Sequence, residues 1–277
     1  MTVQHKTNLT STNPPKPIHP LALVQVLSES PTGFETREII SNPGDERVHV
    51  SNATGMPYLG LCLLKSFSYN EDGTLRVEIF ATGWFSSPRT LVTAGHNLFN
   101  PIVFGSARSG WADTVHAYPA YNGENSPPYG GFEQAEQLYV PSAYQQQLDI
   151  RLDIGIVRFE QPISAENAFL NHEVKSDGEL KSSQALIAGY PLDLGGGLLM
   201  YEGYDRFKAF EPERLFYELD TGKGQSGAPV IVIDGGNQGT VVGIHAHNSS
   251  QTPTAYYPAN SATRITPTIS AWIQQYK

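Results

Sequence analysis

The stretch DTGKGQSGAPV, residues 220–230, places a serine in a glycine-rich turn directly before the apolar run VIVI. A serine hydroxyl that attacks a carbonyl must be exposed, and free backbone N–H groups must point at the oxyanion that develops. Gly224 lets the backbone approach closely, so we expect the N–H groups of Gly224 and Ser226 to form such an oxyanion hole. On its own this pattern is a weak signal, because glycine and serine are common in loops.

A histidine occupies a similar turn in an earlier stretch, TLVTAGHNLF, residues 90–99. An apolar strand ends there, small residues follow, and His96 projects from the turn. Imidazole has an ordinary pKa of about 6.5, so it can take a proton from a serine hydroxyl and return it to a leaving amine. An isolated histidine in such a place more often only bonds a loop, so this signal also needs support.

A carboxylate is the third group that this chemistry needs, since it fixes the tautomer of the imidazole and stabilises its charged form. Asp153 opens the apolar run DIGIVRF, residues 153–159, and Asp149 is a rival in QQLDIRL just before it. We favour Asp153 because the apolar run begins directly after it, whereas Asp149 has the surroundings of a loop. The order His96, Asp153, Ser226 is that of chymotrypsin and not that of subtilisins or α/β-hydrolases.

Together the three weak signals make a strong one. They predict that Ser226 is a nucleophile that forms an acyl-enzyme, that His96 is first its general base and then a general acid, and that Asp153 orients His96. The expected partner is a protein or peptide substrate, and the chemistry needs no metal ion and no cofactor. The oligomeric state stays open, with a monomer as the expectation.

Composition narrows the classes further. The chain has 277 residues, a single cysteine (Cys62) and a formal net charge of −9, so an internal disulfide is excluded. The acidic charge does not favour nucleic acid or an anionic membrane, and no run of about 18 apolar residues predicts a membrane span. From residue 39 onward, short β-type runs alternate with Gly, Pro, Asn and Asp clusters, which is typical of all-β sandwiches and barrels.

Two segments depart from that alternation. Residues 106–148 are rich in Gly, Pro, Tyr and Gln, so we expect long surface loops with little regular structure. At the C-terminus the spacing predicts one helix packed on a barrel, with Thr266 as its N-cap and Pro267 as its first residue. Its apolar stripe comprises Ile265, Ile269, Trp272, Ile273 and Tyr276.

Beyond these patterns, the sequence resembles the glutamyl endopeptidases of the chymotrypsin clan, which are bacterial enzymes with fungal relatives. TAGHNLF, DIGIVRF and DTGKGQSGAPV are similar to the family's three triad blocks. The other similar segments are EIISNPGDERVHVSNATGMPY (38–58), YPAYNGENSPPYGG (118–131), IAGYPLDL (187–194), VVGIHA (241–246) and ATRIT (262–266). The resemblance covers roughly residues 38–277 and implies two six-stranded barrels with the triad between them. We therefore expect an all-β, chymotrypsin-like double β-barrel with a C-terminal helix.

The resemblance also implies cleavage after glutamate or aspartate. In the family, the histidine of GIH and the threonine shortly before the serine contact the substrate carboxylate, and here they are His245 and Thr221. Lys223 stands where the family often has glycine, and we expect it to add positive charge near the substrate. After His245 the sequence AHN (246–248) replaces a glycine-rich run, so the preferences of the neighbouring subsites stay open.

Two alternatives remain at this point. Asp220 takes the position of the aspartate at the base of the trypsin pocket, which would favour Arg or Lys, although some glutamyl endopeptidases also carry Asp there. The other alternative is an inactive protease fold that serves as a binding module. The intact set of three residues argues against the second.

Residues 1–38 are expected to be a leader, and residues 39–277 the trypsin-like protease domain. In trypsin-like zymogens an aspartate before the serine pairs with a new N-terminal amine, but Gln225 carries no charge. In the resembled family the new amine instead helps to bind glutamate, and its mature start aligns near Ile39. Because the preceding residue is Glu38, we predict a zymogen whose propeptide is removed at that bond, with Ile39 contributing to substrate binding.

The first residues, MTVQHKTNLTSTNPPKPIHP, lack the apolar core of a signal peptide. The chain therefore is cytoplasmic, leaves the cell by a non-classical route, or begins after a removed signal. The resembled family, by contrast, is mostly secreted.

Overall fold

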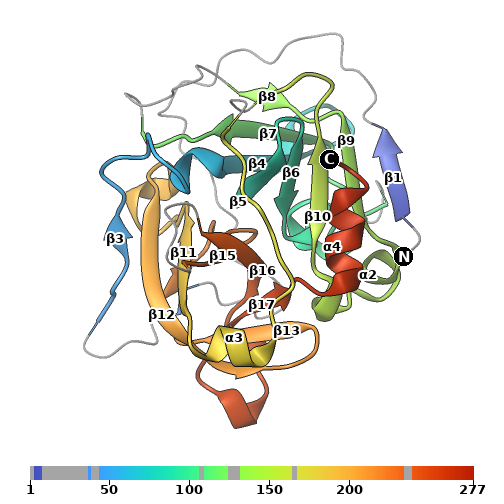
Figure 1. Ribbon diagram of the computed structural model, residues 1–277. Helices are drawn as coiled ribbons and strands as arrows, with labels where there is room; N and C mark the ends of the chain where they lie inside the picture. The colour runs from blue at the N-terminus through green and yellow to red at the C-terminus, as the bar shows by residue number, and fades with distance from the viewer. Residues whose placement is uncertain are drawn as a thin grey trace.

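Two curved β-sheets make up the body of the computed structural model, which describes residues 3–7, 37–38, 44–105, 109–123, 132–163, 167–233 and 239–277. Figure 1 shows the N-terminal sheet in the upper part of the molecule and the C-terminal sheet below it. His96, Asp153 and Ser226 lie on segments that enter or leave strands of these two sheets.

The N-terminal sheet has eight strands in the order β1-β9-β10-β6-β5-β4-β7-β8. Its centre is the antiparallel pair β4–β5, in which Leu61 lies opposite Trp84. β6 is buried along its whole length, with Leu91 and Val92 at its centre. The strands are β1 (Val3–Thr7), β4 (Leu61–Tyr69), β5 (Leu75–Ser87), β6 (Thr90–Thr93), β7 (Thr114–Pro119), β8 (Glu133–Gln134), β9 (Gln137–Pro141) and β10 (Gly155–Arg158).

The C-terminal sheet has the order β11-β15-β16-β17-β13-β12-β3, and an additional β11–β12 pairing closes six of these strands into a barrel. The strands are β3 (Val48–His49), β11 (Gln184–Gly189), β12 (Tyr201–Phe210), β13 (Arg214–Tyr217), β15 (Pro229–Val232), β16 (Thr240–His247) and β17 (Asn260–Arg264). A separate pair joins β2 (Arg37–Glu38) to β14 (Thr221–Gly222). The expected all-β, chymotrypsin-like fold is confirmed, but the first sheet is a half-barrel in the described part of the chain.

The expectation of long surface loops with little regular structure over residues 106–148 is wrong for the described part of that segment. This segment contributes β7, β8 and β9 to the N-terminal sheet, followed by α2 (Ser142–Gln147). Every second residue of β7 and β9 faces the core, as Val115, Ala117, Leu138 and Val140 show. These strands are short, and the surrounding Gly, Pro, Tyr and Gln residues hide their alternation in the sequence.

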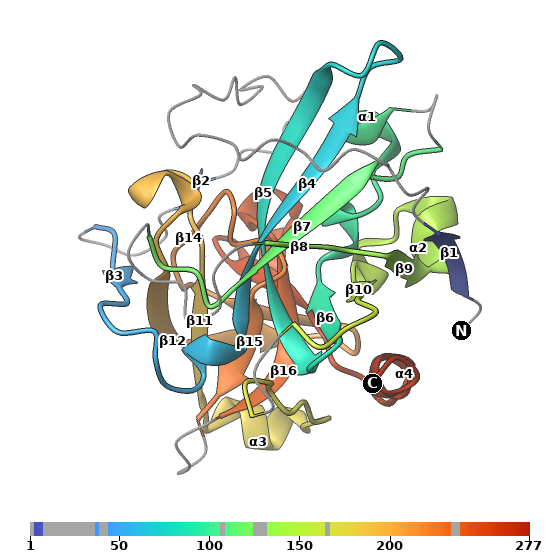
Figure 2. The same cartoon turned by 90° about the horizontal axis from the view of Figure 1, so that it is seen from above.

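The predicted C-terminal helix is confirmed as α4 (Pro267–Gln274), with Thr266 Oγ1 accepting the N–H of Ile269 at 3.2 Å. Beyond the helix, the ring of Tyr276 lies 4.5 Å from that of Tyr139 in β9, measured between centroids. The Thr90 hydroxyl also donates to the Tyr276 carbonyl. α4 follows the C-terminal sheet in the chain, but it lies on the side of the N-terminal sheet formed by β6 and β10 (Figures 1 and 2).

The remaining helices in the described segments are short. They are α1 (Pro101–Phe104), α3 (Asp177–Lys181) and the 3₁₀ turns η1 (Tyr58–Gly60), η2 (Gly95–Asn97), η4 (Ile150–Leu152), η5 (Gly195–Gly197), η6 (Ser249–Gln251) and η7 (Thr254–Tyr256). No helix in the described residues has the length and apolar character needed to cross a membrane. Cys62 is buried in β4, where burial raises the pKa of its thiol, as befits a core residue.

Candidate functional site

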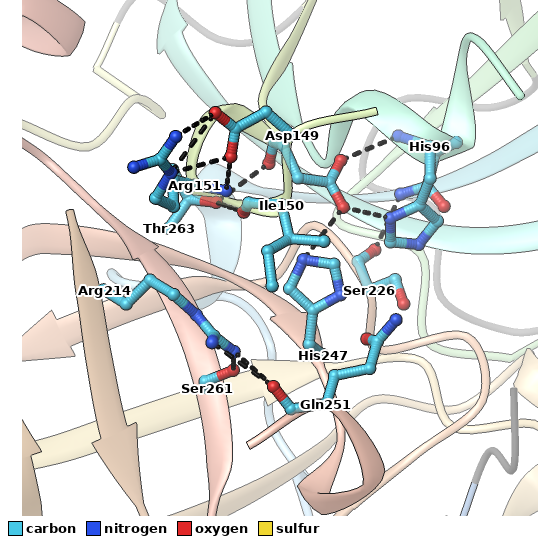
Figure 3. Close-up of polar contacts among 12 residues, drawn as sticks. His96, Asp149, Ile150, Arg151, Arg214, Ser226, His247, Gln251, Ser261 and Thr263 are labelled. Atoms are coloured by element: carbon cyan, nitrogen blue, oxygen red, sulfur yellow. Dashed lines mark hydrogen bonds and ion pairs between the residues drawn. The ribbon is translucent and has the colours of Figure 1, made fainter. Parts of the chain in front are cut away.

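Hydrogen bonds join the turn that carries Ser226 to the turn that carries His96. β6 leads into η2, which contains His96, while Ser226 comes shortly before β15. Asn97 donates from Nδ2 to the Ser226 carbonyl at 3.0 Å and to Thr93 Oγ1 at 2.9 Å. Figure 3 shows Ser226 next to the imidazole of His96. The sequence neighbour of the histidine thus fixes the backbone of the serine.

The residue after the serine must be glycine for the two sheets to meet here. Gly227 has a φ of +91°, and a Cβ built on it would lie 2.1 Å from the carbonyl oxygen of Thr82. The N–H of Thr82 in turn donates to the Ser226 carbonyl at 2.9 Å. The serine turn is therefore packed directly against β5 of the other sheet.

His96 and Asp153 form a direct pair beside β6 and β10. These strands are antiparallel, with Gly155 opposite Thr93, so the residues just outside their adjacent ends meet. His96 Nδ1 lies 2.7 Å from Asp153 Oδ2, and the His96 N–H donates to Asp153 Oδ1 at 2.9 Å. The carboxylate thus holds both the ring and the backbone of the histidine.

Burial and charge act in opposite directions on this pair. Burial lowers the pKa of His96, but the Asp153 carboxylate raises it by more, so the net shift is upward. Burial likewise raises the pKa of Asp153, while His96 lowers it by more, so this carboxyl is ionised at neutral pH. With Nδ1 bound to the carboxylate, Nε2 of the neutral ring is the nitrogen that can accept a proton.

Asp149, the rival carboxylate, has different contacts. It caps η4 by accepting the N–H of Arg151 at 3.0 Å, and it pairs with the Arg151 side chain at 2.7 Å. Figure 3 shows Asp149 turned toward Arg151, whereas the His96 ring bonds to Asp153. The structure therefore brings Asp153 to the imidazole, and not Asp149.

The N–H groups of Gly224 and Ser226 are each oriented by a hydrogen bond to the carbonyl of the preceding residue. In a trans peptide the N–H points opposite to the C=O. The carbonyl before Gly224 accepts from the N–H of Leu192 at 2.6 Å, and the carbonyl before Ser226 accepts from the N–H of Ala228 at 2.9 Å. Both N–H groups therefore face away from these partners, and within the described residues neither donates to another acceptor. Such a pair can bind an oxyanion.

Gly224 can only be glycine in this conformation. Its φ is +93°, and a Cβ would lie 2.1 Å from the carbonyl oxygen of Tyr190. The Gly224 carbonyl accepts from Thr82 Oγ1 at 2.7 Å, which ties the loop to β5. The expectation that this glycine permits a close backbone approach matches its surroundings.

His245 lies on β16 beside the serine turn, because the N–H of Gly227 donates to the His245 carbonyl at 2.7 Å. Its imidazole is buried, and its Nδ1 lies 2.7 Å from the Tyr217 hydroxyl. Burial lowers the pKa of His245 to about 3, and His247 and His96 act in the same direction. Burial also raises the pKa of Tyr217, so both groups are uncharged at pH 7.

The other residues expected at the substrate lie around the same loop. Thr221 is buried in β14, and Lys223 is half-buried directly before Gly224. Asp220 is buried too, and its Oδ2 accepts the N–H of Glu46 at 3.0 Å. The expectation for Ile39 falls outside the described residues.

Several residues near the site were not singled out by the sequence analysis. Asn97 is one, although it directly follows His96. His247 is another, with Nε2 at 3.3 Å from Asp153 Oδ2, and its only signal was the break in the glycine-rich pattern after His245. Arg47, which contacts Gln225, was not singled out although it lies in the similar segment 38–58, because its contact is 178 residues away in the sequence.

Comparison with known proteins gives two distant relatives. No protein-family model matches the sequence. The chain is 27% identical over 222 residues to a Bacillus subtilis protein named extracellular metalloprotease, covering 80% of this chain and 64% of that protein. It is 27% identical over 187 residues to the glutamyl endopeptidase of Bacillus licheniformis, covering 68% of this chain and 53% of that protein. The chain thus spans less than two thirds of the length of both relatives.

Solved structures show the same fold. A Glu endopeptidase in complex with MPD superimposes with a TM-score of 0.66 at 20% identity, covering 83% of this chain and 96% of that one. The thermostable serine protease AL20 superimposes with a TM-score of 0.56 at 18% identity, covering 79% of this chain and 95% of that one. The chymotrypsin-like fold is therefore shown, and the resemblance to glutamyl endopeptidases that the motifs indicated is confirmed.

The name of the Bacillus subtilis relative implies a metal ion. Catalytic zinc sites use about three protein ligands. Within the described ranges, no group of three or more His, Cys, Asp or Glu side chains is arranged to hold a metal ion. The described residues therefore do not fit such a centre.

Proposed function

From the fold of the trypsin-like serine proteases and the likeness to a glutamyl endopeptidase, we propose that this chain is a serine endopeptidase that cleaves after glutamate or aspartate. The observation that carries the proposal is the pair of His96 and Asp153, 2.7 Å apart, beside the turn of Ser226. A protein or peptide is the substrate. The same pair argues against the inactive binding module, which has no need of an oriented imidazole.

The proposed reaction runs through an acyl-enzyme. The Ser226 hydroxyl attacks the carbonyl carbon of the scissile bond while His96 Nε2 takes its proton, and the Gly224 and Ser226 N–H groups bind the resulting oxyanion. His96 then gives the proton to the leaving amine as the C–N bond breaks. Water, deprotonated by the same nitrogen, attacks the acyl group and returns Ser226 to its starting state. Asp153 stabilises the imidazolium in each half.

His245 supports the preference for an acidic side chain. When the Tyr217 hydroxyl donates to Nδ1, the neutral imidazole carries its proton on Nε2 and can donate it to a carboxylate. Hydrogen bonds to a charged acceptor are worth about 1.5–3 kcal/mol. Thr221 adds a hydroxyl and Lys223 a positive charge on the same loop, so the proposed site offers a carboxylate three kinds of partner.

Asp220 gives less support to the alternative, cleavage after Arg or Lys. The alternative needs the Asp220 carboxylate to bind the substrate cation. In the structure its Oδ2 instead accepts the backbone N–H of Glu46 at 3.0 Å. The side chain therefore holds the segment before β3 in place. We therefore place glutamate ahead of the basic residues.

The leader also belongs to this proposal. β2, which ends at Glu38, pairs with β14, and Glu38 lies opposite Thr221. Cleavage after Glu38 would create an amine at Ile39 one peptide away from a residue proposed to bind the substrate carboxylate. Since an α-amine has a pKa of about 8, it would be mostly protonated at pH 7 and would attract that carboxylate. We propose residues 1–38 as the removable propeptide and residues 39–277 as the protease domain.

Three peptides that differ only in the residue before the scissile bond test the function. With Glu, Gln and Arg at that position, we expect the largest kcat/KM for Glu. Gln has the same shape without the charge, so the Glu-to-Gln ratio measures recognition of the carboxylate itself. A larger kcat/KM for Arg would favour the alternative through Asp220, and no cleavage of any peptide would contradict the enzymatic proposal.

A further inference from the structure

A buried arginine lies under the loop that carries Ser226. The Arg47 side chain has no exposed surface and pairs with Asp45 at 2.7 Å and with Asp193 at 2.5 Å. Burial alone would lower the pKa of Arg47, but the hydrogen bonds to both carboxylates more than offset it, so the pKa lies above its ordinary value. The guanidinium is therefore a fixed positive charge, and its planar fork holds both carboxylates in a defined geometry.

Gln225, directly before Ser226, is the third partner of Arg47. Arg47 Nη1 lies 3.4 Å from Gln225 Oε1, and the same oxygen accepts the N–H of Gly222 at 2.8 Å. The Gln225 N–H also donates to the Gly222 carbonyl at 3.1 Å. A Cβ on Gly222 would lie 2.5 Å from Arg47 Nη1, so the guanidinium is in direct contact with the backbone of this loop.

Asp193 extends the same network to the other side of the loop. Arg47 donates to both of its carboxylate oxygens, at 3.1 and 2.5 Å. The adjacent residue, Leu192, donates its N–H to the Lys223 carbonyl at 2.6 Å. That bond fixes the orientation of the peptide that carries the Gly224 N–H. Arg47 thus reaches both ends of the loop, through Asp193 at one end and Gln225 at the other.

We propose that Arg47 is a positioning residue that holds the oxyanion hole in its active geometry. Gln225 takes the place of the aspartate that pairs with a new N-terminal amine in trypsin-like zymogens, and Arg47 supplies a cation there from within the chain. The loop that carries Gly224 and Ser226 consequently keeps its conformation whether or not the bond after Glu38 is cut. This inference rests on the proposed function, because the geometry of the hole matters only if Ser226 attacks a carbonyl.

The test compares two inhibitors of identical sequence ending in glutamate. A peptide aldehyde forms a tetrahedral adduct with Ser226 and needs the oxyanion hole, whereas a peptide with a reduced CH₂–NH bond has no carbonyl oxygen to place there. In Arg47→Met, we expect kcat and the affinity for the aldehyde each to fall about 100-fold, as for loss of an oxyanion-hole donor. Affinity for the reduced peptide should stay unchanged, which a general structural defect would not produce.

Arg264→Met is the matched control. Arg264 also pairs with a carboxylate, Asp177 at 2.7 Å, and donates to the Glu211 carbonyl at 3.0 Å, but it touches none of the loop residues named above. We expect it to leave kcat and both affinities unchanged. Folded Arg47→Met with unchanged kcat, or with equal loss of both inhibitors, would overturn the inference.

A second variant covers the case in which Arg47→Met does not fold. Asp193→Asn keeps the arginine and its pair with Asp45 but weakens the link to the loop, so it should lose aldehyde affinity selectively as well. Wild-type behaviour of this variant would also overturn the inference. A wild-type chain that cleaves no peptide would instead contradict the proposed function, so the two failures are distinguishable.

Discussion

His247 Nε2 lies 3.3 Å from Asp153 Oδ2, the same oxygen that lies 2.7 Å from His96 Nδ1 (Figure 3). Burial lowers the pKa of His247 to about 4, despite the nearby carboxylate, so the ring is neutral at pH 7. With its proton on Nε2, the neutral ring places an N–H dipole beside the Asp153 carboxylate, although the two atoms make no well-formed hydrogen bond, and the ring does not replace the charge that forms on His96. His247→Ala should therefore lower kcat about tenfold and leave KM unchanged, because Asp153 does not contact the substrate.

His247→Gln is the conservative partner of that variant. It keeps an N–H donor of similar reach and should retain most of the wild-type kcat. Steady-state kinetics on one Glu peptide would check both. An equal loss in the two variants, or a loss that falls mainly on KM, would show that His247 acts by packing or on the substrate instead.

Ser226→Ala should lower turnover by about 10⁴–10⁶-fold while the fold stays intact, since the variant removes one hydroxyl. The wild-type chain should also gain the mass of one fluorophosphonate label, located at Ser226 by peptide mapping, and the variant should gain none. If Ser226→Ala turned over substrate within tenfold of the wild-type rate, or if the wild-type chain were labelled at another residue, Ser226 would not be the nucleophile.

His245→Ala should lower kcat/KM on Glu peptides about 10–100-fold, the equivalent of one charge-assisted hydrogen bond, and should affect Gln peptides much less. Asp220→Asn should have little effect on kcat/KM for Glu peptides, because the Asp220 carboxylate accepts a hydrogen bond from the backbone N–H of Glu46. Equal losses on Glu and Gln peptides in His245→Ala would mean that the ring does not contact the substrate carboxylate.

His116 should make the fold sensitive to acid. Its ring lies between those of Phe132 and Phe67, at 4.0 and 4.8 Å between centroids. Burial lowers the pKa of His116 to about 4, and the charge of Lys65 acts in the same direction. An unfolded histidine titrates at about 6.5, so the unfolded state binds more protons between these values, and stability falls as the pH drops through this window.

His116→Phe, in a Ser226→Ala background that prevents self-digestion, tests this sensitivity. Each pH unit between the two pKa values costs about 1.4 kcal/mol. In the parent chain, the titration of His116 should lower the free energy of unfolding by about 2 kcal/mol between about pH 6.5 and about pH 4.5. His116→Phe should abolish this part of the decrease, as measured by urea unfolding. An unchanged pH dependence would mean that His116 is not held neutral in the folded chain.

The sequence indicated those features of the site that depend on residues close to one another in the chain. The turns of His96 and Ser226, the preference for Asp153 over Asp149, and the cap of α4 at Thr266 all depend on residues within a few positions of one another. The error over residues 106–148 has a different cause. Short strands such as β7 and β9 are stabilised mainly by packing against neighbouring strands, which a local sequence pattern does not show.

Long-range polar contacts could not be predicted from the sequence. Arg47 is separated from Asp193 by 146 residues, and although both lie in segments that resemble the family, neither segment indicates that the two side chains pair. His247 was visible only as a departure from the expected glycines, without any indication that it would reach Asp153. Such contacts depend on how the two sheets meet, and one sequence does not contain that information in a local pattern.

The leader is tested by Glu38→Gln, which should block removal of residues 1–38. We expect intact-mass measurement to show a start at Ile39 for active wild type and a full-length chain for Glu38→Gln and for Ser226→Ala. Glu38→Gln should cleave Glu peptides about tenfold more slowly, because the substrate carboxylate lacks the new amine. A full-length chain with full activity on Glu peptides would refute the propeptide.

The most direct test of cleavage after acidic residues by Ser226 is a cleavage profile on a mixed peptide library, read by mass spectrometry, with Ser226→Ala as the control. The account predicts that wild type cuts predominantly after Glu, less after Asp, and that the control cuts nothing. Cleavage predominantly after Arg or Lys, or the same cleavage by wild type and Ser226→Ala, would contradict it.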